Sequence, residues 1–123
     1  MGMRMENGNA AVVGNGNAFA GKTNDIPTRA FQVGVRVIKL CEHLLGRAGV
    51  GRLMAAQILA AGTSIGANVQ EGQAAQSRAD FIAKYCISLK EARETAYRMR
   101  LLIASEVVRP TKIEPLIQEV DEL

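Results

Sequence analysis

Aromatic residues are scarce in this sequence, whose 123 residues include three Phe, two Tyr and no Trp. With so few rings, the core must be built from aliphatic and small residues, as in helix-on-helix packing rather than in a sandwich of sheets. The composition therefore predicts an all-α fold. The length predicts one domain that can bury a core of its own.

Cysteine is also rare, and the two thiols, Cys41 and Cys86, form no C-x-x-C pair. Both fall at apolar positions of predicted helices, which favours buried thiols in a reducing compartment over a disulfide or a metal site. The first residues lack the apolar core of a signal peptide, and no apolar run is long enough to cross a bilayer. We therefore expect a cytoplasmic protein with no membrane contact, no metal and no cofactor.

Acidic residues are few in most of the chain. Residues 1–112 hold all fifteen basic residues and eight acidic ones, whereas residues 113–123 hold four acidic and no basic residues. The body of the chain thus has a balance of +7 and the last eleven residues one of −4. A basic body can attract a polyanion, although the same imbalance is common on solvated helices.

Residues 1–25 are rich in Asn, Gly and Ala and show no sustained apolar period, so we expect a flexible arm ahead of a domain at 26–123. Residues 16–23 fit the phosphate-binding pattern G-x-x-x-x-G-K-[ST]. That site requires a buried strand before it and a helix directly after it. Only residues 10–13 could form the strand, and Pro27 interrupts the helix, so we interpret the match as coincidence.

Four segments have helical periodicity. We predict helices at residues 27–45, 52–72, 77–108 and 111–123, the last of them short. Capping boxes open the third and fourth segments at Ser77 and Thr111. The first segment is expected to bury Phe31, Val33, Val35, Val37, Ile38, Cys41, Leu44 and Leu45. The third is expected to bury Phe81, Ile82, Tyr85, Cys86, Leu89, Ala92, Ala96, Met99, Leu102 and Ile103.

Two basic stripes follow from the helical spacing. The first contains Arg29, Gln32, Arg36, Lys39 and His43, and the second contains Lys90, Arg93, Tyr97 and Arg100. Each stripe can be a solvated face or a surface that contacts phosphates, and in an RNA-binding protein the tyrosine could stack on a base. Tyr97 could equally pack at a protein interface.

Ser64, Asn68 and Glu71 form a polar seam, because spacings of four and three place them on one helical face. Since that face has to pack, we expect a buried network in which Glu71 pairs with an Arg or with backbone amides of the facing helix. The alternative is a catalytic carboxylate. No His, Cys or second acid accompanies Glu71 in register, and we assign no catalytic residue.

Residues 63–72 (TSIGANVQEG), 77–82 (SRADFI) and 87–95 (ISLKEARET) resemble the bacterial four helix bundle proteins, also called 23S rRNA intervening-sequence proteins. The resemblance covers residues 31–123 and extends to the order and spacing of these segments. It implies an antiparallel up-down four-helix bundle, assembly into a ring of identical subunits, a pentamer, and binding of RNA or another nucleic acid. Because the members of this family usually continue further, it also implies a shortened fourth helix.

The leading functional hypothesis is a non-enzymatic helical homo-oligomer that binds RNA or DNA through its basic stripes. The alternative is a protein-protein scaffold whose charges only keep the surface solvated. A steep salt dependence of nucleic-acid binding would distinguish the first from the second. An enzyme ranks third, because the chain has no metal-ligand spacing, no nucleophile beside a base and a single His.

Overall fold

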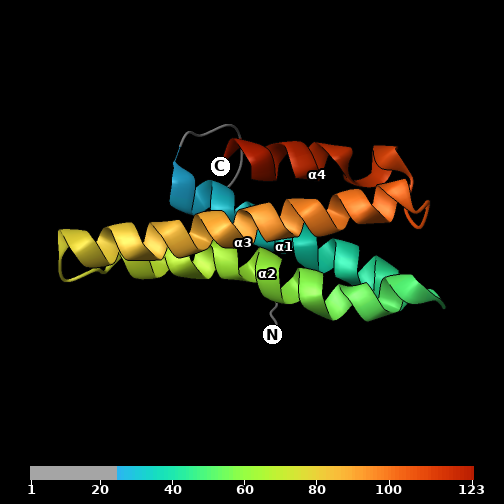
Figure 1. The fold of residues 1–123 in the computed structure, drawn as a ribbon, viewed down its shortest axis with the longest axis horizontal. Coiled ribbons are helices and arrows are strands. Elements are labelled where there is room, and N and C mark those ends of the chain that lie inside the picture. The colour runs from blue at the N-terminus through green and yellow to red at the C-terminus, as the bar shows by residue number, and fades with distance from the viewer. Residues whose placement is uncertain (1–24) are drawn as a thin grey trace, which may run out of the picture.

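A computed structural model describes residues 25–123, and in this range the chain forms four α-helices and no strand. The helices are α1 (Ile26–Leu45), α2 (Val50–Gln73), α3 (Arg78–Ala104) and α4 (Pro110–Glu122). Successive helices run in opposite directions, and α4 is the shortest of the four (Figure 1). The all-α prediction and the antiparallel bundle are confirmed. The predicted arm and the P-loop-like pattern lie almost wholly outside the described residues.

Local sequence explains where three of the helices begin. Asp25 caps α1, since its carboxylate accepts a hydrogen bond from the backbone N–H of Thr28. Ser77 caps α3 and accepts from the N–H of Asp80 at 3.0 Å, as the capping box predicted. Gly49 has φ of 113°, a conformation that favours glycine, and it starts α2 two residues earlier than predicted.

The connection between α3 and α4 differs from the prediction. Helix α3 ends at Ala104, four residues early, and Glu106 follows with φ of 63° in the left-handed region. Helix α4 begins at Pro110 behind Arg109, without a side-chain cap, so the capping box predicted at Thr111 is wrong. Proline suits a first helical position because the missing N–H would have no partner there. The result is a tight turn that places Arg109 beside the end of α1.

Helices α1 and α2 pack closely because α2 has glycines where α1 crosses it. A Cβ built on Gly62 would lie 2.7 Å from both γ-carbons of Val37, and one on Gly66 would lie 3.3 Å from the carbonyl oxygen of Ala30. The thiol of Cys41 donates to the carbonyl of Ala55 at 3.4 Å. Burial raises the pKa of Cys41. This contact is dry and built from small residues, as the composition predicted.

The core is aliphatic, but two groups of predicted core residues lie outside it. Phe31, Val35, Ile38 and Leu45 of α1 are 42–52% exposed, because the core side of α1 is formed by Ala30, Val33, Val37, Leu40, Cys41 and Leu44. Phe81, Ile82, Cys86 and Leu89 of α3 are also exposed. Figure 1 shows the reason: α4 lies along only part of α3, and the α2–α3 hairpin extends past both α1 and α4.

No helix in residues 25–123 is both long enough and apolar enough to cross a membrane.

Candidate nucleic-acid interface

A groove runs between α1 and α4. Its wide end is a cavity of about 620 Å³ at the α3–α4 turn, and its narrow end is a cavity of about 290 Å³ further along α1. His43 and Lys112 line both cavities, so the two adjoin, and we call them together the α1–α4 groove. Its basic and imidazole residues are Arg36, Lys39, His43, Arg47, Arg109 and Lys112, and its apolar lining includes Leu40, Ile113 and Leu116.

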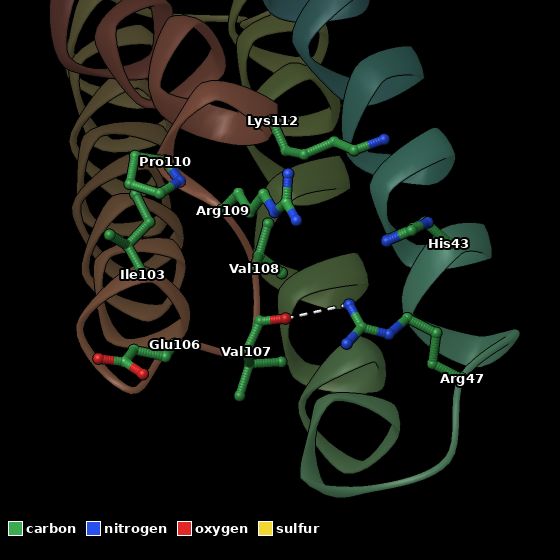
Figure 2. Close-up of a pocket in the computed structure, with 9 residues that line it drawn as sticks. All are labelled: His43, Arg47, Ile103, Glu106, Val107, Val108, Arg109, Pro110 and Lys112. Carbon is green, nitrogen blue, oxygen red and sulfur yellow. Dashed lines mark hydrogen bonds between the residues drawn. The ribbon is translucent and has the colours of Figure 1, made fainter.

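Nitrogen-bearing side chains from two helix ends converge at the wide end. Figure 2 shows His43 and Arg47 of the α1 end facing Arg109 and Lys112 of the α4 start across a common space. The Nη1 of Arg47 donates to the carbonyl oxygen of Val107 at 3.0 Å, which ties α1 to the α3–α4 turn. The carboxylate of Glu106 points away from these four side chains, on the far side of the turn (Figure 2).

The groove contains five cations that make no ion pair within residues 25–123, and outside the groove Arg52, Arg78, Lys90 and Arg93 also make none. Outside the groove, carboxylates pair with Arg29 (Glu119, Glu122), Lys84 (Glu71), Arg98 (Glu94) and Arg100 (Asp121). Within residues 25–123, Arg36, Lys39, Arg47, Arg109 and Lys112 make no ion pair. Besides the hydrogen bond from Arg29, the charge of Arg36 also lowers the pKa of Glu119, but none of the five groove cations is held in an ion pair in the described chain, so they are available to an anion from outside.

The first predicted stripe divides at Arg36. Arg36 and Lys39 lie in the groove, whereas Arg29 is held by Glu119 at 2.9 Å and by Glu122 at 3.5 Å. The hydrogen bond from Arg29 lowers the pKa of Glu119, and the same bond raises the pKa of Arg29. This pair joins α1 to α4 near the start of α1, and neither residue lines the groove. Arg29 is therefore occupied with holding α4 against α1.

The second predicted stripe lies on α3, away from the groove. Lys90, Arg93 and Tyr97 are exposed there, and Tyr97 is 61% exposed. Arg100 forms an ion pair with Asp121 and lines a cavity of mixed charge with Glu114. The structure thus separates the two stripes instead of joining them into one surface.

Three cations of the groove, Arg47, Arg109 and Lys112, were not among the predicted site residues. A signal for two of them exists in the sequence. In an up-down bundle the first and third connections lie at the same end, so Arg47 and Arg109, which flank those connections, are expected to be neighbours. Lys112 could not be placed this way, because its direction depends on the rotation of α4 about its axis.

The polar seam does not form the buried network that we predicted. The Oγ of Ser64 donates to the carbonyl of Ala60 at 2.7 Å, and the Nδ2 of Asn68 donates to the carbonyl of Ser64 at 2.9 Å. Both side chains thus bond to their own helix. The carboxylate of Glu71 is 59% exposed and pairs with Lys84 of α3 at 3.1 Å. The facing helix does supply the partner, but it is a lysine rather than the Arg or backbone amides that we predicted, and the carboxylate is not buried.

Two apolar surfaces lie outside the groove. Phe31, Val35, Ile38 and Leu45 form a line along α1, which we call the α1 apolar stripe. An apolar cavity of about 400 Å³ lies beside the α2–α3 hairpin, with Ile82, Tyr85, Cys86 and Leu89 among its lining residues. Exposed apolar surface of this kind is typical of protein contacts.

Comparisons with known proteins agree with this architecture. Residues 22–123 match the family described as 23S rRNA-intervening sequence protein. A crystal structure of a protein of unknown function from the S23 ribosomal protein family of Bacteroides thetaiotaomicron is similar, with 40% sequence identity and a TM-score of 0.74. The similarity covers 80% of this chain and 90% of that chain. No curated protein matches the sequence.

Proposed function

Because this chain belongs to the family of 23S rRNA-intervening sequence proteins, we propose that it binds RNA, without catalysing a reaction, through the α1–α4 groove. The observation that carries the proposal is the set of five cations in the groove that have no carboxylate partner in the described chain. Lys and Arg that face phosphates release condensed counterions, and this release supplies much of the affinity of nucleic-acid-binding proteins.

The length of the groove fits a nucleic-acid strand better than a single ion. Arg36 lies nine positions before the end of α1 at Leu45, roughly 14 Å of helix, and Arg47 follows two residues beyond that end. Cations therefore lie along a length that several consecutive phosphates can follow. The apolar lining from Leu40, Ile113 and Leu116 offers surface for sugars and bases between them. Lys90, Arg93 and Tyr97 on α3 are a second surface that could contact RNA in the same way.

We also propose that the protein is a homo-oligomer, for which the resemblance in sequence implies a pentameric ring. The α1 apolar stripe supports this, because it lies on a side of α1 that the core leaves exposed. The exposed apolar residues at the start of α3 are a second surface for a neighbouring subunit. In a closed ring each groove is repeated once per subunit, so a modest charge per chain becomes a strong field.

The cytoplasm is the proposed location, because two free thiols and an RNA ligand both fit a reducing compartment that contains RNA. The alternative function is a scaffold that binds other proteins. The α1 apolar stripe favours it, since the same surface could accept a different protein.

Retention of RNA at several salt concentrations tests the proposal. The double variant Arg36→Glu/Lys39→Glu should lose at least about tenfold in affinity, and its logarithmic salt slope should be shallower by about 1.4, because two phosphate contacts are lost. The comparison variant is Lys90→Glu/Arg93→Glu, which makes the same charge change on the second candidate surface on α3. Light scattering of each variant confirms that the assembly persists.

An equal loss in both double variants would contradict the groove as the main contact. Unchanged retention in both would favour the scaffold. A monomer in light scattering of the parent protein would contradict the ring.

A further inference from the structure

The two ends of the α1–α4 groove differ in size and in the elements that supply their cations. Arg36, Lys39 and Lys112 line the narrow cavity of about 290 Å³. At the α3–α4 turn, Arg47, Arg109 and Lys112 line the wide cavity of about 620 Å³ without an ion pair in the described chain. Three cations therefore line each end, and the end at the α3–α4 turn has room for a larger group.

The charge at the wide end exceeds what one backbone phosphate can balance. Three cations, the imidazole of His43 and one acid, Glu106, line the cavity, and the carboxylate of Glu106 points away from the four nitrogen-bearing side chains (Figure 2). A phosphodiester inside a strand carries a single negative charge. A phosphate monoester carries about −1.5 to −2 at neutral pH and presents three acceptor oxygens. The monoester is therefore the better match for this cluster.

We propose that the wide end of the groove binds the terminal phosphate monoester of an RNA strand whose following phosphates lie along the narrow end. This inference rests on the proposed function. The cavity at the wide end has a volume of about 620 Å³, which is within the roughly 300–1,000 Å³ of small-molecule sites. It can therefore admit a terminal nucleotide as well as its phosphate.

The positions of the donors fit this role. The bond from Arg47 to the carbonyl of Val107 fixes its guanidinium while leaving other N–H groups available to the cavity. Arg109 approaches from the opposite side, and two guanidinium groups can each bind a pair of phosphate oxygens. Helix α4 begins at Pro110 beside the cavity, and the positive end of its dipole adds to the attraction of a dianion.

The test compares fluorescence anisotropy of one labelled single-stranded RNA in three forms: 5′-phosphate with 3′-hydroxyl, 5′-hydroxyl with 3′-phosphate, and hydroxyl at both ends. We expect one phosphorylated form to bind roughly tenfold more tightly than the form without a terminal phosphate, as for one charge-assisted contact. The phosphorylated form that binds more tightly identifies which end of the strand enters the cavity. Competition by a nucleoside 5′-monophosphate shows whether the free monoester occupies the same site.

Two matched variants separate this inference from RNA binding itself. Arg109→Gln, at the wide end only, should bring the ratio of affinities between phosphorylated and unphosphorylated RNA close to one. Arg36→Gln, at the narrow end only, should weaken binding of all three RNAs and leave that ratio unchanged. Equal binding of the three RNAs by the parent protein would overturn terminal recognition while leaving the RNA-binding function intact. No binding of any RNA would overturn both.

Discussion

Helix α1 packs against both α2 and α4, but the two contacts are built from different residues. They also have different consequences. Glycines of α2 let the two backbones approach so closely that Val37 leaves no room for a Cβ at Gly62. Helix α4 instead presents branched side chains such as Ile113 and Leu116, which are buried and also line the α1–α4 groove. The α1–α2 contact is therefore dry, whereas the α1–α4 contact leaves a groove in which unpaired cations remain accessible.

This difference indicates how a small bundle can separate stability from function. The close contact removes apolar surface from water and leaves no space for a ligand. The looser contact contributes less packing, and an ion pair between Arg29 and Glu119 fastens it at one end.

The largest effect on stability is expected from Gly62→Ala. The new methyl group would lie 2.7 Å from two carbons of the fully buried Val37, and overpacking of this kind costs about 1–3 kcal/mol of unfolding free energy. Urea denaturation measures it. Gly34→Ala is the control, since no atom lies within 4 Å of its added Cβ, and helix propensity should raise its stability by up to about 1 kcal/mol. Equal stability of the two variants would contradict a glycine-dependent contact.

A smaller loss of stability is expected from Arg29→Gln, which removes the ion pair between α1 and α4. Losing the half-buried charge-assisted bond to Glu119 should cost about 1–2 kcal/mol at neutral pH. The folded-state pKa of Glu119 is lowered, so this stability is complete above the ordinary pKa of glutamate and is lost as pH falls through the lowered value. The two proteins should therefore converge in stability in acid.

Urea denaturation at a series of pH values checks the effect of Arg29→Gln. Glu122→Gln is its control, because Glu122 is 61% exposed and lies 3.5 Å from Arg29, and it should cost less than Glu119→Gln. A difference between Arg29→Gln and the parent protein that stays constant into acid would exclude Glu119 as the partner that matters.

The smallest effect is expected from Glu71→Ala, which lies outside both contacts of α1. Its ion pair with Lys84 is exposed, and pairs of this kind contribute about 0–1 kcal/mol. Thermal unfolding of Glu71→Ala and Lys84→Ala should show changes within about 0.5 kcal/mol. A loss of several kcal/mol in unfolding free energy would instead support the buried network that the sequence pattern predicted.

The sequence pattern located the helices well, because their caps and periods are local. The spacing of Ser77 and Asp80 predicted the start of α3, and Gly46 marked the end of α1. The pattern did not predict which apolar residues are buried. Helix α1 has apolar residues on two adjacent sides, and periodicity alone could not show that Val37 packs in the core while Val35 is exposed.

The candidate site was predicted in part. Arg36 and Lys39 were identified because they share one side of a single helix. Arg47 and Arg109 join them from positions 62 residues apart in the chain, and their meeting requires the α3–α4 turn. Arg29 lies on the same predicted stripe as Arg36, yet of the two only Arg29 forms an ion pair with Glu119. The hydrogen bond from Arg29 lowers the pKa of Glu119 most, and the charge of Arg36 lowers it further without an ion pair.

The sequence by itself determined that the chain forms helices, where most of them begin and end, and which residues share a helical side, because these depend on interactions within a few residues. Only the tertiary structure decided which side of each helix faces the core and which cations keep their charge unpaired. Those outcomes depend on the rotation of each helix about its axis and on its distance from its neighbours. Both are set by side chains far apart in the chain, such as Gly62 against Val37 and Glu119 against Arg29.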